Sequence, residues 1–229
     1  MPFLNKDQIR LLRHTTTTKK VILLSGDIES RYEVAPVWQT GEQYITHNQI
    51  ITKDKAKLIC SQFFYAGDKK ATALVWKDLK NGLHDDREVV RKTVERYNSA
   101  DILLGQNIKN FDIKTINNQA LFYKLPPIEP KFVIDILPLI RKTTKGLSNK
   151  LDYRSTRLGF GGKNKMEMQY WIDICEYGVS PYKKMVPYGL KDTVDTMKVF
   201  WRELPYYNFS KKDYKYILTQ SDSTPADPD

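Results

Sequence analysis

Four acidic residues lie in three separated segments of the chain, each beside an apolar run. Asp27 and Glu29 lie in VILLSGDIES, Asp112 lies in DILLGQNIKNFD, and Asp192 lies in PYGLKDTVDT. Carboxylates that are drawn together near buried segments repel one another and lose hydration, so something positive must lie between them. A divalent cation is the natural candidate, and these four residues are its candidate ligands.

The first segment is typical of a short buried strand. Residues 21–24 are apolar and rich in β-branched side chains, and Gly26 lets the chain end or bend there. In extended backbone Asp27 and Glu29 point to one face while Ile28 points to the other. Two carboxylates therefore converge at a strand end. Asp-x-Glu by itself is also typical of a solvated strand end, so the other two segments decide the interpretation.

Asp112 lies in the first turn of a helix expected over residues 112–123. Ile113, Ile116, Ala120 and Leu121 recur with the spacing of a buried helix face. Taken alone, an acid in this position is also explained as a cap that complements the helix dipole.

Tyr188 and Asp192 lie four residues apart in a helix expected over residues 188–203, so they project from the same side. A phenol and a carboxylate then face the same place. Asp195 could replace Asp192 in this argument, but Asp192 is the acid in register with the tyrosine. Taken alone, the pair is equally typical of a packed Tyr beside a solvent-facing Asp.

In order and spacing, the three segments resemble the exonuclease motifs of the DnaQ-like 3′-to-5′ exonucleases, in the DEDDy subclass with Tyr in the third motif. The matching patterns are Asp27-Ile28-Glu29, Asn107-x-x-x-Phe111-Asp112 and Tyr188-x-x-x-Asp192. Further stretches, at 35–38, 135–137 and 148–152, resemble a phage and bacterial branch, and the resemblance covers about residues 20–205. The chain departs from the pattern at Ser30, where Thr is usual, and has Pro187 where a sister subclass has His.

The resemblance implies an α/β protein with an RNase H-like (DnaQ-like exonuclease) fold, a central mixed β-sheet flanked by helices. It also implies an enzyme, a two-metal-ion 3′-5′ exonuclease. The four acids would hold the two ions, with Asp27 contacting both, Glu29 and Asp192 holding the one that activates water, and Asp112 supporting the other. Tyr188 would orient the attacking water, since a free phenol with a pKa near 10 is a poor base.

The residue types themselves favour Mg²⁺ or Mn²⁺, because the ligands are hard oxygens and no Cys or His cluster accompanies them. Two such ions stabilise the attacking and the leaving oxygen of a displacement at phosphorus. The resemblance further implies that the products are nucleoside 5′-monophosphates, released from the 3′ end of single-stranded or frayed DNA. The candidate substrate-binding residues are Ile28, Ser30, Asn107, Phe111, Lys163 and Lys165.

Charge supports a polyanionic partner. The chain has 37 Lys and Arg against 27 Asp and Glu, a net charge of +10, and such a surface contacts phosphates, although net charge can also serve solubility alone. Further candidate strand contacts are Lys142, Lys145, Lys150, Arg154 and Arg157. Lys163 and Lys165 lie in GFGGKNK, which lacks the spacing of a phosphate-binding P-loop and reads as a flexible basic turn.

We expect nucleic acid as the partner, with DNA preferred over RNA. A DNA polymerase that lacks its own exonuclease domain is a second expected partner, because no polymerase motifs fit in 229 residues and proofreading would be supplied in trans. An RNA 3′-5′ exonuclease, an RNase H-like endonuclease and a non-catalytic nucleic-acid-binding module remain alternatives. The presence of all four acids argues against the binding module, and fold and motif do not fix the substrate.

One domain is expected over residues 20–210, with an N-terminal extension at 1–19 and a flexible acidic tail at 211–229. Strands are expected near 20–27, 34–39, 57–65, 72–77 and 101–104, with helices near 86–98, 112–123, 146–158, 165–177 and 188–203. Residues 132–134 are either a sixth strand or a loop. Cys60 and Cys175 each lie in an apolar segment, typical of buried thiols rather than a disulfide or metal pair. We expect a cytoplasmic protein without membrane association, since neither a long apolar stretch nor a signal-peptide pattern is present.

Overall fold

Five strands form one mixed sheet in the order β3-β2-β1-β6-β7. The computed structural model describes residues 21–162 and 166–218. β1 pairs antiparallel with β2, and β2 with β3, whereas β1 pairs parallel with β6, and β6 with β7. The strands are β1 Leu23–Ser30, β2 Leu58–Tyr65, β3 Thr72–Val75, β6 Ile102–Gly105 and β7 Phe132–Asp135, and a separate pair consists of β4 Lys77–Asp78 and β5 His84–Asp85.

Helices connect and cover these strands. The α-helices are α2 Arg87–Ser99, α3 Asp112–Phe122, α4 Ile136–Thr143, α5 Leu151–Arg157, α6 Met168–Tyr177, α7 Met185–Glu203 and α8 Lys211–Leu218. Short 3₁₀ turns lie at His47–Gln49, Lys80–Gly82, Pro181–Lys183 and Leu204–Tyr206. None of the helices in the described ranges is long and apolar enough to cross a membrane.

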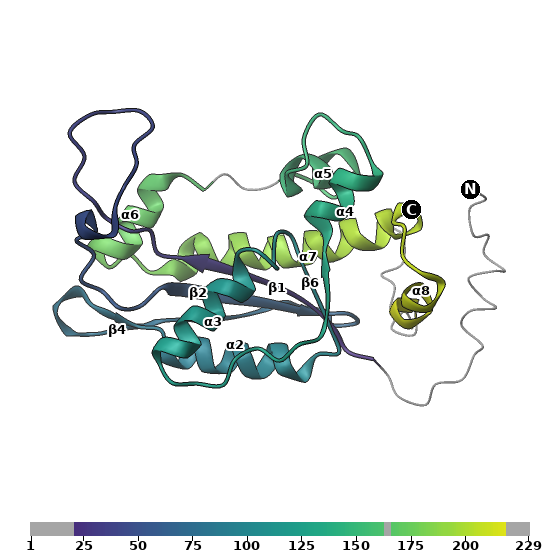
Figure 1. Ribbon diagram of the computed structural model, residues 1–229, viewed down its shortest axis with the longest axis horizontal. Coiled ribbons are helices and arrows are strands. Elements are labelled where there is room, and N and C mark those ends of the chain that lie inside the picture. The colour runs from purple at the N-terminus through teal and green to yellow at the C-terminus, as the bar shows by residue number, and fades with distance from the viewer. Residues whose placement is uncertain (1–20, 163–165, 219–229) are drawn as a thin grey trace.

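The sheet lies between α2 and α3 on one face and α7 on the other (Figure 1). Alternation along β1 divides its side chains between these layers. Leu24 and Ile28 belong to the core cluster that includes α2 and α3, whereas Leu23 belongs to the cluster that includes Met197 and Phe200 of α7. Asp27 and Glu29 share the parity of Leu23, so the first two acids lie on the α7 side.

Gly26 has a different role from the one expected. The sequence predicted that the chain ends or bends there, but β1 continues straight through Gly26 to Ser30. A Cβ at this glycine would lie 2.2 Å from the hydroxyl oxygen of Tyr97. The glycine therefore admits the buried tyrosine of α2 against the strand, and Asp27 and Glu29 lie within β1 rather than after it.

Residues 34–39, expected to be a strand, form part of a long loop between β1 and β2. Val34 makes one backbone contact across this loop, where its carbonyl accepts a hydrogen bond from Ile51 N at 2.8 Å. The following residues are exposed from Pro36 onward, and proline has no N–H with which to extend a ladder. The segment therefore forms no ladder with another strand, and the loop rises at the upper left of Figure 1.

Other differences lie at the edges of elements. Residues 132–134 belong to strand β7, α5 begins at Leu151 rather than near 146, and α4 was not expected at all. The sequence placed a flexible tail from residue 211, whereas Lys211–Leu218 is helix α8 with Ile217 fully buried in the core. The N-terminal extension, Lys163 and Lys165, and residues 219–229 lie outside the described ranges.

Candidate active site

The second acidic motif is joined to the first by one buried hydrogen bond. Asp112 Oδ1 accepts from the backbone N–H of Ile28 at 3.1 Å. The parallel pairing of β1 with β6 covers only Leu23 to Ser25, so β1 extends beyond the end of its neighbour. The first turn of α3 fills this step, and its carboxylate takes the N–H that lies between Asp27 and Glu29.

The third motif is joined to β1 on the other face of the sheet. Ser25 Oγ donates a hydrogen bond to the carbonyl oxygen of Thr193 at 2.9 Å, and both residues are fully buried. Ser25 lies two residues before Asp27 on the same side of β1, and Thr193 directly follows Asp192. This bond fixes α7 against the strand close to two of the candidate ligands.

A glycine allows α7 to come this close. A Cβ at Gly189 would lie 2.4 Å from Nε2 and 2.5 Å from Cδ of Gln62, a fully buried side chain of β2. Gln62 is the antiparallel partner of Asp27. The glycine between Tyr188 and Asp192 therefore sets the distance of the third motif from the strand pair that carries the first.

Tyr188 is held on the side of α7 that faces α6. Its ring packs edge-to-face on Trp171, with 6.5 Å between the ring centroids and an angle of 82°. Asp192 is buried, whereas the tyrosine is half-buried. Asp195, which could have replaced Asp192 in the sequence pattern, is buried and ion-paired with Lys191. The ion pair gives Asp195 a structural partner on α7.

The charges of the acids reach the buried groups around β1. Burial raises the pKa of Tyr97 well above its usual value, and the negative charges of Asp112 and Asp27 raise it further. Burial likewise raises the pKa of Cys60, with Glu29 and Asp27 adding to the effect. Three of the four acids from two motifs thus act electrostatically on one small region of the core.

Burial changes the pKa of Asp112 itself. Desolvation is the largest effect and raises the pKa of its carboxyl to about 7, although hydrogen bonds from backbone N–H groups oppose it. The negative charge of Asp135 adds to the increase. A nearby cation favours the ionised form of such a carboxyl, so Asp112 fits a metal-binding role.

The donor set as a whole is made of carboxylate oxygens, the ligands preferred by Mg²⁺ and Mn²⁺. In residues 21–162 and 166–218, however, no three Asp, Glu, His or Cys side chains are grouped so that they could hold one ion. Metal binding is a proposal, which rests on the chemistry of the donors and on the hydrogen bonds that join the motifs to β1.

The loop between β6 and α3 depends on Asp135, which the sequence pointed to only as part of the 135–137 stretch and without a role. The carboxylate of Asp135 accepts hydrogen bonds from Asn107 N at 2.8 Å and Lys109 N at 3.2 Å. It also caps α4 by accepting from Leu137 N at 3.2 Å. Asn107 has a left-handed backbone, with φ of 64°, which asparagine tolerates better than most residues. An Asp directly before the apolar run ILPLI was the available signal, because Asp is a preferred helix cap.

The candidate substrate residues fall into three groups. Asn107 and Ser30 are half-buried and Phe111 is 44% exposed, so each presents surface at the end of the sheet where the motifs meet. Ile28 is buried, with its side chain in the core and its N–H bonded to Asp112. Lys163 and Lys165 lie outside the described residues.

One further candidate strand contact is structural. Arg154 is buried, and its Nε lies 3.1 Å from Oε1 of Glu203. Its guanidinium also donates to Thr144 Oγ1. This arginine joins α5 to α7 and is not available to a nucleic acid strand, in contrast to the exposed Lys142, Lys145, Lys150 and Arg157.

The fold and the site define an α/β protein with a central mixed sheet and acidic motifs at one end of its central strand. A family B DNA polymerase from the hyperthermophilic archaeon Pyrobaculum calidifontis has a similar fold, with a TM-score of 0.59 and 15% sequence identity. The match covers 84% of this chain and 26% of the polymerase chain, so this protein spans about a quarter of that structure. No known protein family and no curated protein matches the sequence.

Proposed function

We propose that this protein is a metal-dependent nuclease that removes nucleotides from the 3′ end of DNA, single-stranded or frayed, as nucleoside 5′-monophosphates. The observation that carries the proposal is the convergence of three distant acidic motifs on β1. Asp112 bonds Ile28 of that strand, and Thr193, beside Asp192, bonds Ser25 of the same strand. Asp112 and Asp192 are buried, and burial of a carboxylate is costly unless something compensates its charge.

Asp27, Glu29, Asp112 and Asp192 would hold two divalent cations, which supply charge neutralisation for the attacking and leaving oxygens at phosphorus. The chain's own contribution is to position these ligands. β1 holds the first two on one side of the strand, α3 presents the third from its first turn, and α7 presents the fourth. Each ligand is on a helix or strand, which holds geometry better than a loop.

Tyr188 is proposed to orient the attacking water through its hydroxyl. Its ring is held by Trp171, so the hydroxyl has a defined direction on the same side of α7 as Asp192. A phenol has an ordinary pKa near 10, too high for an efficient base at neutral pH. The tyrosine is therefore proposed to hold the water in place rather than to accept its proton.

DNA is proposed as the substrate in preference to RNA. The net charge of +10 suits a phosphate-rich ligand, and the structure with a similar fold is that of a DNA polymerase. We further propose that the enzyme acts beside a DNA polymerase that lacks its own exonuclease domain, correcting ends that the polymerase presents.

Digestion of 5′-labelled single-stranded DNA, with RNA of the same sequence alongside, tests the proposal. In Mg²⁺ or Mn²⁺ the labelled DNA is expected to shorten stepwise from its 3′ end, and EDTA or Asp27→Asn is expected to abolish the ladder. Tyr188→Phe, which keeps the ring on Trp171, is expected to slow cleavage without loss of DNA binding. Faster degradation of RNA would correct the substrate, and tight binding with no cleavage in any metal would reject the nuclease.

A further inference from the structure

A cavity of about 340 Å³ lies beyond the end of β1, next to the acidic motifs. Its walls come from the continuation of β1 at Arg31, from the segment that leads into β2, and from the outer side of α3 at Lys114. This volume falls within the range of small-molecule sites, roughly 300–1,000 Å³. Arg31 follows Glu29 by two residues on the chain that continues β1, so this wall of the cavity lies close to the first acidic motif. Lys114 lies in the same helix as Asp112, on a different side of it.

The cavity has an excess of positive charge. Four cationic and two acidic side chains line it. Arg31 is neutralised by Asp54 and Glu176, each at 2.9 Å, and a second cation, Lys57, lies 2.7 Å from Glu33. These two cations are already committed to protein partners.

The other two cations are available to a ligand. Within the described ranges, Lys55 and Lys114 take part in no ion pair, and the ammonium of Lys114 makes a long hydrogen bond of 3.4 Å to Asn110. The side chains of Thr115 and Asn118, which also line the cavity, make no hydrogen bond to any described residue. Two ammonium groups beside uncommitted polar groups favour an anionic ligand that accepts hydrogen bonds.

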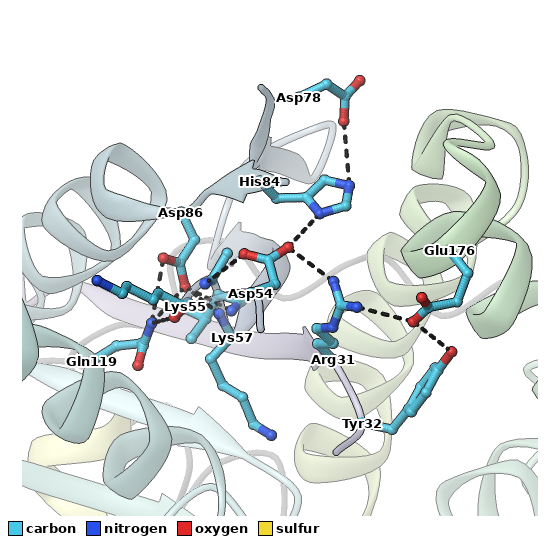
Figure 2. Close-up of polar contacts among 12 residues, drawn as sticks. Arg31, Tyr32, Asp54, Lys55, Lys57, Asp78, His84, Asp86, Gln119 and Glu176 are labelled. Atoms are coloured by element: carbon cyan, nitrogen blue, oxygen red, sulfur yellow. Dashed lines mark hydrogen bonds and ion pairs between the residues drawn. The ribbon is translucent and has the colours of Figure 1, made fainter. Parts of the chain in front are cut away.

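One wall of the cavity is built by a buried polar network (Figure 2). Asp54 accepts hydrogen bonds from Arg31 at 2.9 Å and contacts His84 Nδ1 at 2.6 Å. His84 in turn stacks on Trp76, with 3.8 Å between the ring centroids. Arg31, His84 and the Asp54 side chain are all more than nine-tenths buried. The network fixes the segment that begins at Asp54 against the small β4–β5 pair.

The opposite end of the same segment is tied to the helices. Asp86, which is fully buried, accepts hydrogen bonds from Lys57 N and Leu58 N, both at 2.8 Å (Figure 2). Gln119 of α3 donates both to Asp86 and to the carbonyl of Lys55, the latter at 2.9 Å. The wall that carries Lys55 is therefore fixed relative to the helix that carries Lys114. The two ammonium groups flank a cavity that exists before a ligand enters.

We propose that this cavity binds the phosphate group of a nucleotide, gripped by Lys55 and Lys114. The inference rests on the proposed function, because the adjoining acids identify nucleotides as the ligands brought to this end of the sheet. Lysines bind phosphate as point charges, and Thr115 and Asn118 supply hydrogen bonds to phosphate or sugar oxygens. The phosphate comes either from the bound strand or from a free nucleoside 5′-monophosphate.

Calorimetric titration of the full chain in EDTA tests the cavity without any cleavage. The probes are dAMP, deoxyadenosine, inorganic phosphate and a single-stranded oligonucleotide. The variant is Lys55→Gln with Lys114→Gln, and the control is Lys69→Gln with Lys212→Gln, which removes two exposed lysines from the β2–β3 turn and from α8. Loss of two charge-assisted contacts is expected to weaken phosphate-containing ligands roughly tenfold or more, with the control unchanged.

The ligands separate the two sources of phosphate. Weaker dAMP binding with unchanged oligonucleotide binding assigns the cavity to the free nucleotide, and the reverse assigns it to the strand. Equal affinities in the variant and the control for both ligands, or deoxyadenosine binding as tightly as dAMP with no effect on the oligonucleotide, would overturn the proposal. A protein that binds dAMP through these lysines but cleaves no strand would keep the cavity and reject the exonuclease. Cleavage of the strand together with unchanged ligand affinities in the Lys55→Gln, Lys114→Gln variant would support the exonuclease and reject the cavity.

Discussion

The carboxylate of Asp112 accepts a hydrogen bond from the backbone N–H of Ile28, 84 residues earlier in the chain. This bond holds the first turn of α3 against the end of β1 that extends beyond β6. It also gives Asp112 two separable functions, since the side chain both accepts a structural hydrogen bond and carries a negative charge. Substitutions can remove one function without the other.

Asp112→Asn keeps an oxygen that accepts from Ile28 but removes the charge. We expect the rate of 3′-end cleavage to fall by at least roughly 100-fold, because even indirect supporters of metal sites are worth about 10- to 100-fold. Stability should be close to that of the native chain, since burial already disfavours the charged carboxylate. Cleavage rates and urea unfolding measured on the same preparation check both parts.

Asp112→Ala removes the acceptor as well and leaves the Ile28 N–H buried without its partner. We expect it to be less stable than Asp112→Asn by about 1–3 kcal/mol. Equal unfolding midpoints for the two variants would show that the hydrogen bond contributes little and that α3 is held in place by its apolar face.

Gly189→Ala tests whether close approach of α7 positions Tyr188 and Asp192. Alanine is a better helix former, yet its Cβ would lie 2.4 Å from Nε2 of Gln62. Either the helix or the glutamine must move, and a misplacement of about 1 Å can reduce a rate by roughly 100-fold. We therefore expect slower cleavage with near-normal DNA binding.

The matched test adds Gln62→Ala, which removes the side chain that the new Cβ would meet. The double variant is expected to recover much of the lost rate, although Gln62→Ala alone leaves a cavity. If the double variant is no faster than Gly189→Ala, the glycine serves something other than this contact. Steady-state cleavage rates of the four proteins form the required cycle.

The two thiols are predicted to be unreactive in the folded protein. Burial raises the pKa of Cys175 to about 11 and the pKa of Cys60 well above its usual value. The thiolate is the reactive form, so at pH 8 alkylation of Cys175 should be slower than that of a free thiol by roughly 100-fold or more. Its rate should rise with pH up to about pH 11, above the range in which a free thiol is already fully ionised.

Iodoacetamide labelling followed by mass spectrometry checks this prediction. Full labelling in urea is the control that both thiols are chemically intact. Rapid labelling of either thiol at pH 8 without denaturant would mean that its segment opens readily, which the buried positions of Cys60 in β2 and Cys175 in α6 argue against.

The sequence predicted the strands and helices whose apolar pattern lies within a single segment. The apolar run before Asp27, the helix after Asp112 and the helix that carries Tyr188 and Asp192 all occur in the structure, because a periodic apolar face determines both the type and the buried side of an element. The central mixed sheet with helices on both faces also agrees with the structure.

The features that depend on distant partners could not be predicted. Gly26 was interpreted as a bend because the ring that occupies the space beside it belongs to Tyr97, 71 positions later in the sequence. Residues 34–39 were expected to be a strand but form no ladder with another strand. The role of Gly189 follows only from the position of Gln62. For the two glycines, the role is set by a tertiary contact that the local sequence does not show.

Asp135→Ala is predicted to impair catalysis without touching the four candidate ligands. The carboxylate accepts from Asn107 N, Lys109 N and Leu137 N, so its removal leaves three backbone donors without this acceptor. The loop that precedes α3 then loses both of its hydrogen bonds to Asp135. One of these bonds helps to hold Asn107 in its left-handed backbone conformation. We expect a rate loss of roughly 10- to 100-fold, as for other residues that hold a site in place.

Asp135→Asn distinguishes positioning from charge. Its amide oxygen still accepts from Asn107 and Leu137, so most of the rate should return, whereas the negative charge that raises the pKa of Asp112 is gone. The cleavage rate and the apparent affinity for oligonucleotide, measured separately for both variants, report the two contributions. An asparagine variant as slow as the alanine variant would mean that the charge of Asp135, rather than its grip on the loop, supports the site.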